Sequence, residues 1–210
     1  MIEKTIKTIE NGVAQFEELY EKHHFMEDKD AYAAWCAQTY YYTLHTCRLL
    51  EMAGNNVENP KLKETFLAHV EEEKGHEYLA KKDYREMTEN KKVEDFPEFP
   101  ETHHFWSYIE SETDKNPLAI FGYAIALENL AAKSAKAPLE ALVKLNWPIA
   151  FIKEHYEVDQ EHTEIIIELA KTLTDSEREY VNGIVETVFE NYFSICHACI
   201  SYSSSQKAVA

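Results

Sequence analysis

Apolar residues recur at helical spacing along almost the whole chain of 210 residues, and this periodicity constrains the fold more than any other feature. No segment alternates apolar and polar residues as a half-buried strand does, and no segment repeats another. The length and the 45% share of hydrophobic residues are typical of one soluble domain. We therefore expect an all-α bundle of seven to eight helices formed by residues 1–203, followed by a disordered tail, residues 204–210.

Capping residues and prolines predict where the helices begin and end. Asn59-Pro60 and Asn116-Pro117 each put a proline in the first turn of a helix, and residues 174–177 form a capping box. Two prolines mark residues 89–101 as the one long linker, and a short turn begins near Pro138. The predicted helices cover about residues 2–22, 28–54, 59–88, 102–112, 116–135 and 146–171, with a last helix from residue 174.

The chain is strongly acidic, because 21 Lys and Arg stand against 38 Asp and Glu and give a net charge of −17. Phosphate backbones and anionic lipid surfaces repel such a chain, so neither nucleic acid nor membrane is an expected partner. The five glycines form no phosphate-binding loop and no G-x-S-x-G elbow. No stretch is apolar enough to span a membrane, and the first residues lack a signal peptide's apolar region, so we expect a cytoplasmic protein.

The four cysteines, Cys36, Cys47, Cys196 and Cys199, are too few and too scattered for a disulfide scaffold. Cys196 and Cys199 form a C-x-x-C pair, but the segment around them is apolar and helical. That context favours small buried core thiols over a redox or metal role.

Ionisable residues interrupt the apolar face of the helix that begins near Asn146. Steps of four and three residues along this face give Ile152, His155, Asp159, His162, Ile166 and Leu169. Burying the three polar members without partners would cost several kcal/mol. They are therefore metal ligands or a hydrogen-bonded His–Asp–His network in the core, unless the helix face is assigned wrongly.

Two other helices carry ionisable residues at the middle of an apolar face. In the helix from Asn59, Glu73 and His76 form a Glu-x-x-His pair, which would place both side chains on one face, one turn apart. The alternative is a solvated face, because Glu71, Glu72, Glu73 and Glu77 make a run of charge. In the helix from Asn116, Glu128 is the one acidic residue within an apolar segment.

Together the three helices offer three carboxylates and three imidazoles, and this set suits two Fe(II) or Mn(II) ions. Three carboxylates nearly balance the charge of two divalent ions. Mixed nitrogen and oxygen donors favour Fe or Mn over Mg or Ca, and structural zinc sites usually use thiolates. The expected metal ligands are Glu73, His76, Glu128, His155, Asp159 and His162. We expect no catalytic side chain beyond them.

In these residues the sequence resembles the heme-oxygenase-like diiron oxidases and oxygenases, whose fold is shared by heme oxygenase, thiaminase II and pyrroloquinoline quinone synthase. The family pattern is a Glu and a His on one core helix, a Glu on a middle helix and His-x-x-x-Asp-x-x-His on a later one. The last motif matches residues 155–162 and is the most specific, and the similarity covers about residues 15–200.

The resemblance implies a heme-oxygenase-like bundle with two Fe(II) ions and O2 as co-substrate. It implies oxidation of a small organic substrate, amino-acid-like or fatty-acid-like, in biosynthetic metabolism. A homodimer and an external electron donor are compatible with this family. The alternative is a non-catalytic or metal-free small-molecule-binding protein of the same fold, similar to thiaminase II or the quinone synthase.

Sister groups of the same fold fit the sequence less well. Heme oxygenase needs a proximal His, which His23 or His24 could supply, but a heme pocket has no use for the 155–162 motif. Thiaminase II needs a mid-chain Cys nucleophile, and no Cys lies between Val57 and Ile195. The quinone synthase needs a basic pocket, which an acidic chain offers poorly.

Four further residues are weaker candidates for the site. His69 lies one turn before Glu73 and would hydrogen-bond a ligand carboxylate or sit satisfied in the core. Tyr41, His45 and Arg48 come from the aromatic segment that includes Tyr40 to Tyr42, which we expect to line the core and the substrate pocket. Arg48 would clamp a substrate carboxylate or form a surface ion pair.

Overall fold

The computed structural model describes residues 2–209, apart from the side chains of residues 161, 164 and 209. Within this range every regular element is helical, so the predicted all-α fold is confirmed. The elements are α1 (Ile2–His23), η1 (Phe25–Glu27), α2 (Lys29–Thr43), α3 (Thr46–Asn56), α4 (Pro60–Glu73), α5 (His76–Met87), η2 (Val93–Asp95), α6 (Pro100–Lys115), α7 (Leu118–Ser134), α8 (Lys136–Lys144), α9 (Ala150–Ala170) and α10 (Asp175–Val209).

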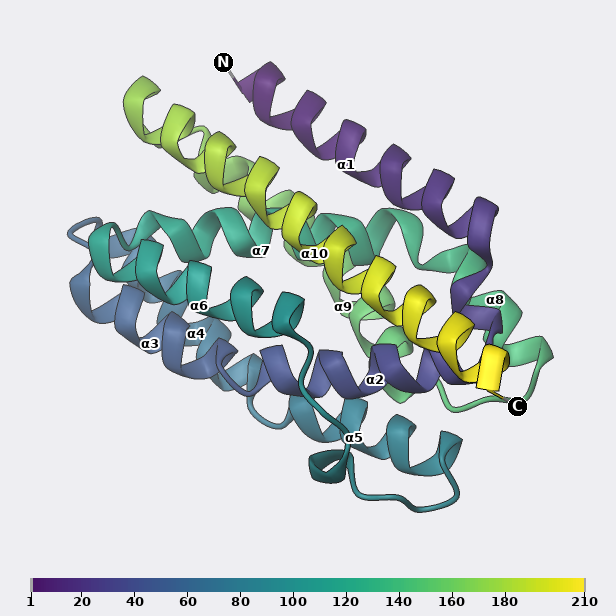
Figure 1. Ribbon diagram of the computed structural model, residues 1–210. Helices are drawn as coiled ribbons and strands as arrows, with labels where there is room; N and C mark the ends of the chain where they lie inside the picture. The colour runs from purple at the N-terminus through teal and green to yellow at the C-terminus, as the bar shows by residue number, and fades with distance from the viewer. Residues whose placement is uncertain (1, 210) are drawn as a thin grey trace.

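Helix α7 lies inside the bundle and packs against α1, α9 and α10 (Figure 1). Its sequence is almost entirely apolar, and buried residues occur on all of its sides. Gly122 allows the close approach of α10, because a Cβ atom there would lie 2.7 Å from Cγ2 of Ile184. Glu128 belongs to this central helix, so its carboxylate is forced into the interior.

Two of the predicted helices are each interrupted once. The predicted helix 28–54 divides into α2 and α3, because the hydrogen-bond ladder is disturbed at Leu44 and His45. There, His45 N–H donates to the carbonyl of Tyr42, three residues back. The break lets the two halves take different neighbours: α2 packs between α5 and α10, whereas α3 packs on α4.

The predicted helix 59–88 divides into α4 and α5 at Gly75, whose φ of 93° lies in the left-handed region. An α-helix cannot continue through that conformation, and glycine adopts it without a Cβ penalty. Glu73 is therefore the last residue of α4 and His76 the first of α5. The expectation that both stand on the face of one helix is wrong, because a tight turn joins them.

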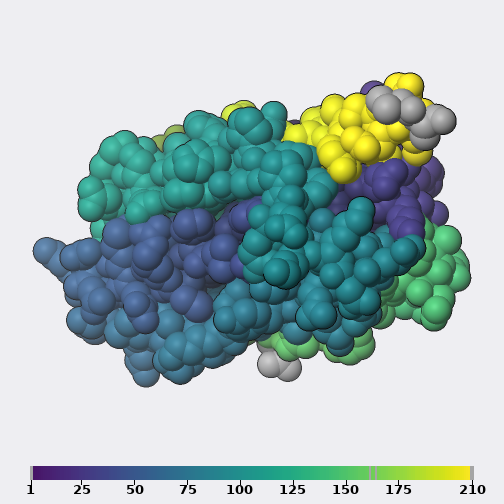
Figure 2. Space-filling view, turned by 60° about the horizontal axis from the view of Figure 1, so that its bottom comes forward, coloured from purple at the N-terminus to yellow at the C-terminus, as the bar shows by residue number. Residues whose placement is uncertain are grey.

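The chain end is also more ordered than expected, because α10 continues to Val209 and residues 204–209 are helical. Ser203 Oγ donates a 2.6 Å hydrogen bond to Oδ1 of Asp28, and Lys207 forms an ion pair with the same carboxylate. The expected disordered tail is thus a helix anchored to the start of α2, and of residues 204–210 only residue 210 lies outside the described part of the chain. Figure 2 shows this end of α10 lying against the N-terminal part of the chain.

None of the described helices is long and apolar enough to cross a membrane.

Candidate metal centre

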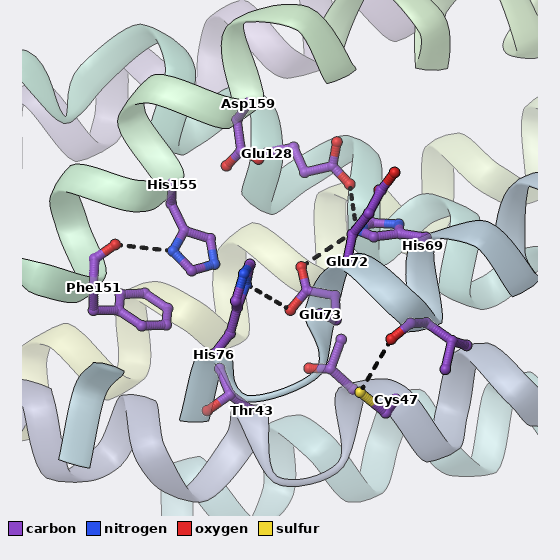
Figure 3. A network of polar contacts seen from close by, with 12 residues as sticks. Thr43, Cys47, His69, Glu72, Glu73, His76, Glu128, Phe151, His155 and Asp159 are labelled. Carbon is purple, nitrogen blue, oxygen red and sulfur yellow. Dashed lines mark hydrogen bonds and ion pairs between the residues drawn. The ribbon is translucent and has the colours of Figure 1, made fainter. Parts of the chain in front are cut away.

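Helices α4, α5, α7 and α9 bring carboxylates and imidazoles together in the interior (Figure 3). His69 and Glu73 come from the last two turns of α4, and His76 from the first turn of α5. Glu128 lies on α7, whereas His155, Asp159 and His162 lie on successive turns of α9. All six expected metal ligands therefore face one another, and His69 joins them.

The first group consists of Glu73, His76 and His155, each of which offers a donor atom within 4.8 Å of the other two. His76 Nδ1 lies 3.2 Å from Oε2 of Glu73, and the ring centroids of His76 and His155 are 4.8 Å apart. His155 Nδ1 lies 2.9 Å from the carbonyl oxygen of Phe151, to which an Nδ1–H donates. This hydrogen bond fixes the ring and leaves Nε2 free to bind an ion.

The second group consists of His69, Glu128 and His162, whose donor atoms also lie within 4.8 Å of one another. His69 Nε2 is 3.6 Å from Oε1 of Glu128, and His162 Nδ1 is 3.7 Å from Oε2 of the same carboxylate. Sequence reasoning gave His69 only a supporting place. The spacing of His69 and Glu73 predicted that they share one face of α4. The contact of His69 with Glu128 could not be predicted, because Glu128 lies on α7.

Asp159 adjoins both groups. Its side chain is 6% exposed, and Oδ1 lies 3.6 Å from Nδ1 of His162. Burial raises the pKa of Asp159, although the imidazoles of His162 and His155 oppose that rise. An anionic Asp159 therefore depends on the imidazoles or cations beside it.

Glu128 is the side chain that most requires a cation. It is 6% exposed, and neither of its carboxylate oxygens has a hydrogen-bond partner within the described residues. Burial raises its pKa well above the usual value for Glu, and the nearby charges of Asp159 and Glu73 raise it further. A divalent ion would reverse this effect, since it stabilises the carboxylate form. The donor set around Glu128 fits a metal ion better than it fits a closed hydrogen-bond network.

Glu73 is in the opposite state. Burial would raise its pKa, but the hydrogen bond to His69 and the imidazole of His76, 3.2 Å away, outweigh that effect and hold the pKa below the usual value. The carboxylate of Glu73 raises the pKa of His76 in turn. Likewise, the carboxylate of Asp159, 3.6 Å away, raises the pKa of His162. Imidazoles thus stabilise the charged forms of Glu73 and Asp159, whereas burial and like charges favour the neutral form of Glu128.

A cavity of about 100 Å³ opens beside both groups, and His69, Glu73, Glu128, His155 and Asp159 form part of its wall. The rest of the wall is mostly aromatic and aliphatic. Its aromatic members are Phe16, Trp35, Tyr42, Tyr123, Phe151 and Tyr192. No Lys or Arg is among the described residues of the wall, so the cavity offers a small molecule an apolar surface and the carboxylate–imidazole cluster.

The other weak candidates from the sequence do not line this cavity. Tyr41 donates hydrogen bonds to the carbonyls of Val93 and Phe96 and so holds the linker between α5 and α6. His45 stacks on Trp106 with ring centroids 3.9 Å apart. Arg48 forms an ion pair with Glu110, and its side chain is 48% exposed. Of the two roles expected for Arg48, the structure therefore has the surface ion pair.

Glu72, which belongs to the run of charge that indicated a solvated face, lies at the edge of the cluster. The side chain of Glu72 is 53% exposed, but Oε2 lies 3.6 Å from Nε2 of His162. Since Nδ1 of His162 faces Glu128 and Asp159, Glu72 approaches the outer side of the same ring. In metal proteins a carboxylate in this position orients the imidazole.

Cys196 and Cys199 are fully buried in α10, as expected for core thiols, and neither belongs to the cluster. Burial raises the pKa of both thiols.

Comparison with known proteins agrees with this architecture. Residues 33–191 match a family described as iron-containing redox enzymes. A domain of unknown function from Shewanella denitrificans, described as having a heme oxygenase-like fold, superposes with a TM-score of 0.83 and 21% identity, over 98% of this chain and 96% of that one. A TenA homolog from Pseudomonas syringae pv. tomato superposes with a TM-score of 0.74 and 12% identity, over 95% of this chain and 92% of that one.

No curated protein matches the chain. The identities to the two solved structures show a common fold only, whereas the family match rests on the sequence itself and covers most of the chain. The chain therefore belongs to the iron-containing redox enzyme family and has the heme oxygenase-like fold that its sequence predicted.

Proposed function

We propose that this protein is an O2-dependent non-heme diiron oxidase or oxygenase that acts on a small organic substrate. The observation that carries the proposal is Glu128, a buried carboxylate without hydrogen-bond partners, set among imidazoles beside an apolar cavity. The family description supports iron as the metal. We assign the ion ligands to Glu73, His76, Glu128, His155, Asp159 and His162.

Two bound Fe(II) ions would supply electrons to O2 and so activate it, and O2 would be the oxidant. The protein would supply geometry and exclude water. His155 is held by the Phe151 carbonyl, 2.9 Å from its Nδ1, so its other nitrogen is oriented before any ion binds. Tyr42 and Tyr192 are buried in the cavity wall and keep that side of the cluster dry.

The cavity favours a substrate with an apolar body. Within its described wall the charged groups are the carboxylates and imidazoles of the cluster, and no Lys or Arg is available to a substrate carboxylate. When two ions are bound, the carboxylates are engaged and are not free to receive a substrate ammonium group. Of the two expected classes, a fatty-acid-like substrate therefore fits better than an amino-acid-like one, with its polar end at the ions.

The test is substrate oxidation by protein loaded with Fe(II) under anaerobic conditions. The loaded protein is mixed with medium-chain fatty acids or with amino acids, and O2 consumption and products are followed. We expect O2 consumption and product formation with fatty acids, and neither result when a chelator replaces iron. Turnover of a substrate without iron or without O2 would overturn the oxidase proposal.

The second candidate is a metal-free small-molecule-binding protein or enzyme of the same fold. The contacts of Glu73 with His69 and His76, at 3.3 and 3.2 Å, favour it, since they hold this carboxylate against two imidazoles without an ion. Elemental analysis of protein purified with added iron separates the two candidates. Two iron ions per chain support the oxidase, and less than a tenth of that amount supports the metal-free protein.

A further inference from the structure

His69 lies where one imidazole nitrogen meets carboxylates from both groups. Its side chain is 14% exposed, and Nε2 lies 3.3 Å from Oε1 of Glu73 and 3.6 Å from Oε1 of Glu128. The sequence match to the family's ligand pattern does not include this residue. The contact with Glu128 is therefore a feature of this chain that its motif leaves unassigned.

The distance to Glu128 is too long for a hydrogen bond, and Oε1 of Glu128 has no other partner in the described part of the chain. It is, however, close to the separation of two donors that share an ion. With bond lengths of about 2.0–2.2 Å, neighbouring donors around one ion lie roughly 3 Å apart. Small movements of two side chains would bring Nε2 and Oε1 onto the same ion.

Without His69 the two ions would have unequal donors. The first would have two imidazoles, those of His76 and His155, whereas the second would have only that of His162. With His69 each group contains one Glu and two His, and Asp159 adjoins both. We propose that His69 is a metal ligand, which binds the same ion as Glu128 and His162 and completes a seven-residue centre.

This proposal rests on the proposed diiron function but concerns binding alone. Without an ion, the Nε2–H of His69 donates to Glu73. Binding of an ion to Nε2 of the neutral imidazole would require the ring proton to move from Nε2 to Nδ1, so the hydrogen bond to Glu73 would be given up when the ion binds. The competing role is a hydrogen bond that only orients Glu73.

The experiment is an anaerobic titration of metal-free protein with Co(II), followed by its visible absorption and by the amount of metal that stays bound. Wild type is compared with His69→Ala and His69→Gln, and His104→Gln on the exposed face of α6 is the control. Glutamine keeps a donor for the hydrogen bond to Glu73 but is a poor replacement for a nitrogen ligand. Thermal unfolding of each metal-free variant checks that it folds.

We expect wild type and His104→Gln to bind two Co(II) ions. Both His69 variants should bind one ion with unchanged affinity and the other at least about tenfold more weakly, with altered absorption bands. Added imidazole should restore the second ion in His69→Ala. A His69→Gln variant with two tightly bound ions and the wild-type spectrum would overturn the proposal and leave the diiron function intact.

The remaining outcomes separate the two claims. If wild type binds two ions and His69 is required for one of them, but the iron-loaded protein does not react with O2, then the proposed function fails and His69 remains a ligand. If wild type binds fewer than two ions, both claims fail.

Discussion

The two groups of the cluster are built in different ways. In the first group, Glu73 is hydrogen-bonded to His69 and pairs with His76 at 3.2 Å, and His155 is hydrogen-bonded to the backbone of Phe151. In the second group, Glu128 has no hydrogen-bond partner at all in the described structure. The first group is held by the protein itself, whereas in the second the carboxylate of Glu128 is left without a partner that a cation would supply. On the proposed function, the two ions would therefore differ in how far their binding depends on contacts already made by the protein.

Replacing Glu128 should have the largest effect. Glu128→Gln removes the anionic donor of the second group, so we expect one ion to be lost and activity to fall by at least about 100-fold. The metal-free variant should be as stable as wild type or more so, because an unpaired buried carboxylate is costly. Metal analysis, O2 consumption and calorimetry of the metal-free protein measure these effects.

The exposed Glu71, replaced by Gln, is the matched control and should change none of these quantities. If Glu128→Gln destabilised the metal-free protein by several kcal/mol, the carboxylate would have a partner there, and the contrast between the two groups would fail.

Asp83 tests how the start of α9, the helix that carries His155 of the first group, is held in place. It is fully buried, and its two oxygens accept hydrogen bonds from the backbone N–H groups of Ala150 and Phe151 at the start of α9. Burial raises the pKa of Asp83 to about 6 in spite of these hydrogen bonds. Because the folded pKa exceeds the unfolded one, the folded state gives up its proton later than the unfolded state as the pH rises.

The free energy of unfolding of wild type should therefore fall relative to that of Asp83→Asn between pH 4 and pH 7. The shift is at most about 3 kcal/mol, from two pKa units at 1.36 kcal/mol each and allowing for rounding. Urea denaturation at several pH values measures it. A difference that is constant with pH would mean that burial does not control this carboxyl group.

The turn at Gly75 tests whether the first group depends on its tight connection. Gly75→Ala adds a Cβ that meets only Cδ2 of Tyr78, at 3.7 Å, so the cost comes from the left-handed backbone. We expect a loss of about 1–2 kcal/mol in unfolding free energy and weaker binding of one Co(II) ion. Gly75→Asn should lose less, because Asn tolerates this conformation better. Equal effects of Ala and Asn would contradict a backbone cause.

Arg48 should show the smallest effect. Its ion pair with Glu110 is half exposed and lies outside the cavity, so Arg48→Ala should change the unfolding free energy by less than about 1 kcal/mol. Binding of both ions and the KM of a substrate found in the oxidation assay should stay the same. A KM increase of tenfold or more would give Arg48 the carboxylate-binding role that its surface position argues against.

How much could be predicted from the sequence depends on how local each feature is. His155, Asp159 and His162 belong to one unbroken helix, so their spacing alone places them on one face. Glu73 and His76 also meet, but through a turn that the periodic pattern concealed. Gly75 was the one residue in the sequence that could indicate this turn, since glycine lowers the stability of a helix and adopts the left-handed conformation found there.

Features that depend on distant elements could not be predicted in this way. The partner of His69 comes from α7, and the contact depends on how α7 and α4 approach each other. Of Tyr40, Tyr41 and Tyr42, only Tyr42 lines the cavity. Tyr41 instead donates a hydrogen bond to the carbonyl of Phe96, in the linker between α5 and α6. The serine-rich end of the chain looked disordered, and its order depends on Asp28, which is 175 residues away from Ser203.

The carboxylate of Asp28 has a consequence for the order of assembly during synthesis. It caps the first turn of α2 through the N–H groups of Asp30 and Ala31, and it also binds Ser203 and Lys207. Helix α2, although early in the sequence, therefore obtains its full set of partners only after residues 203–207 have left the ribosome. Until then the apolar surface of α2 that packs against α10 is uncovered, because α10 is synthesised after the other described helices.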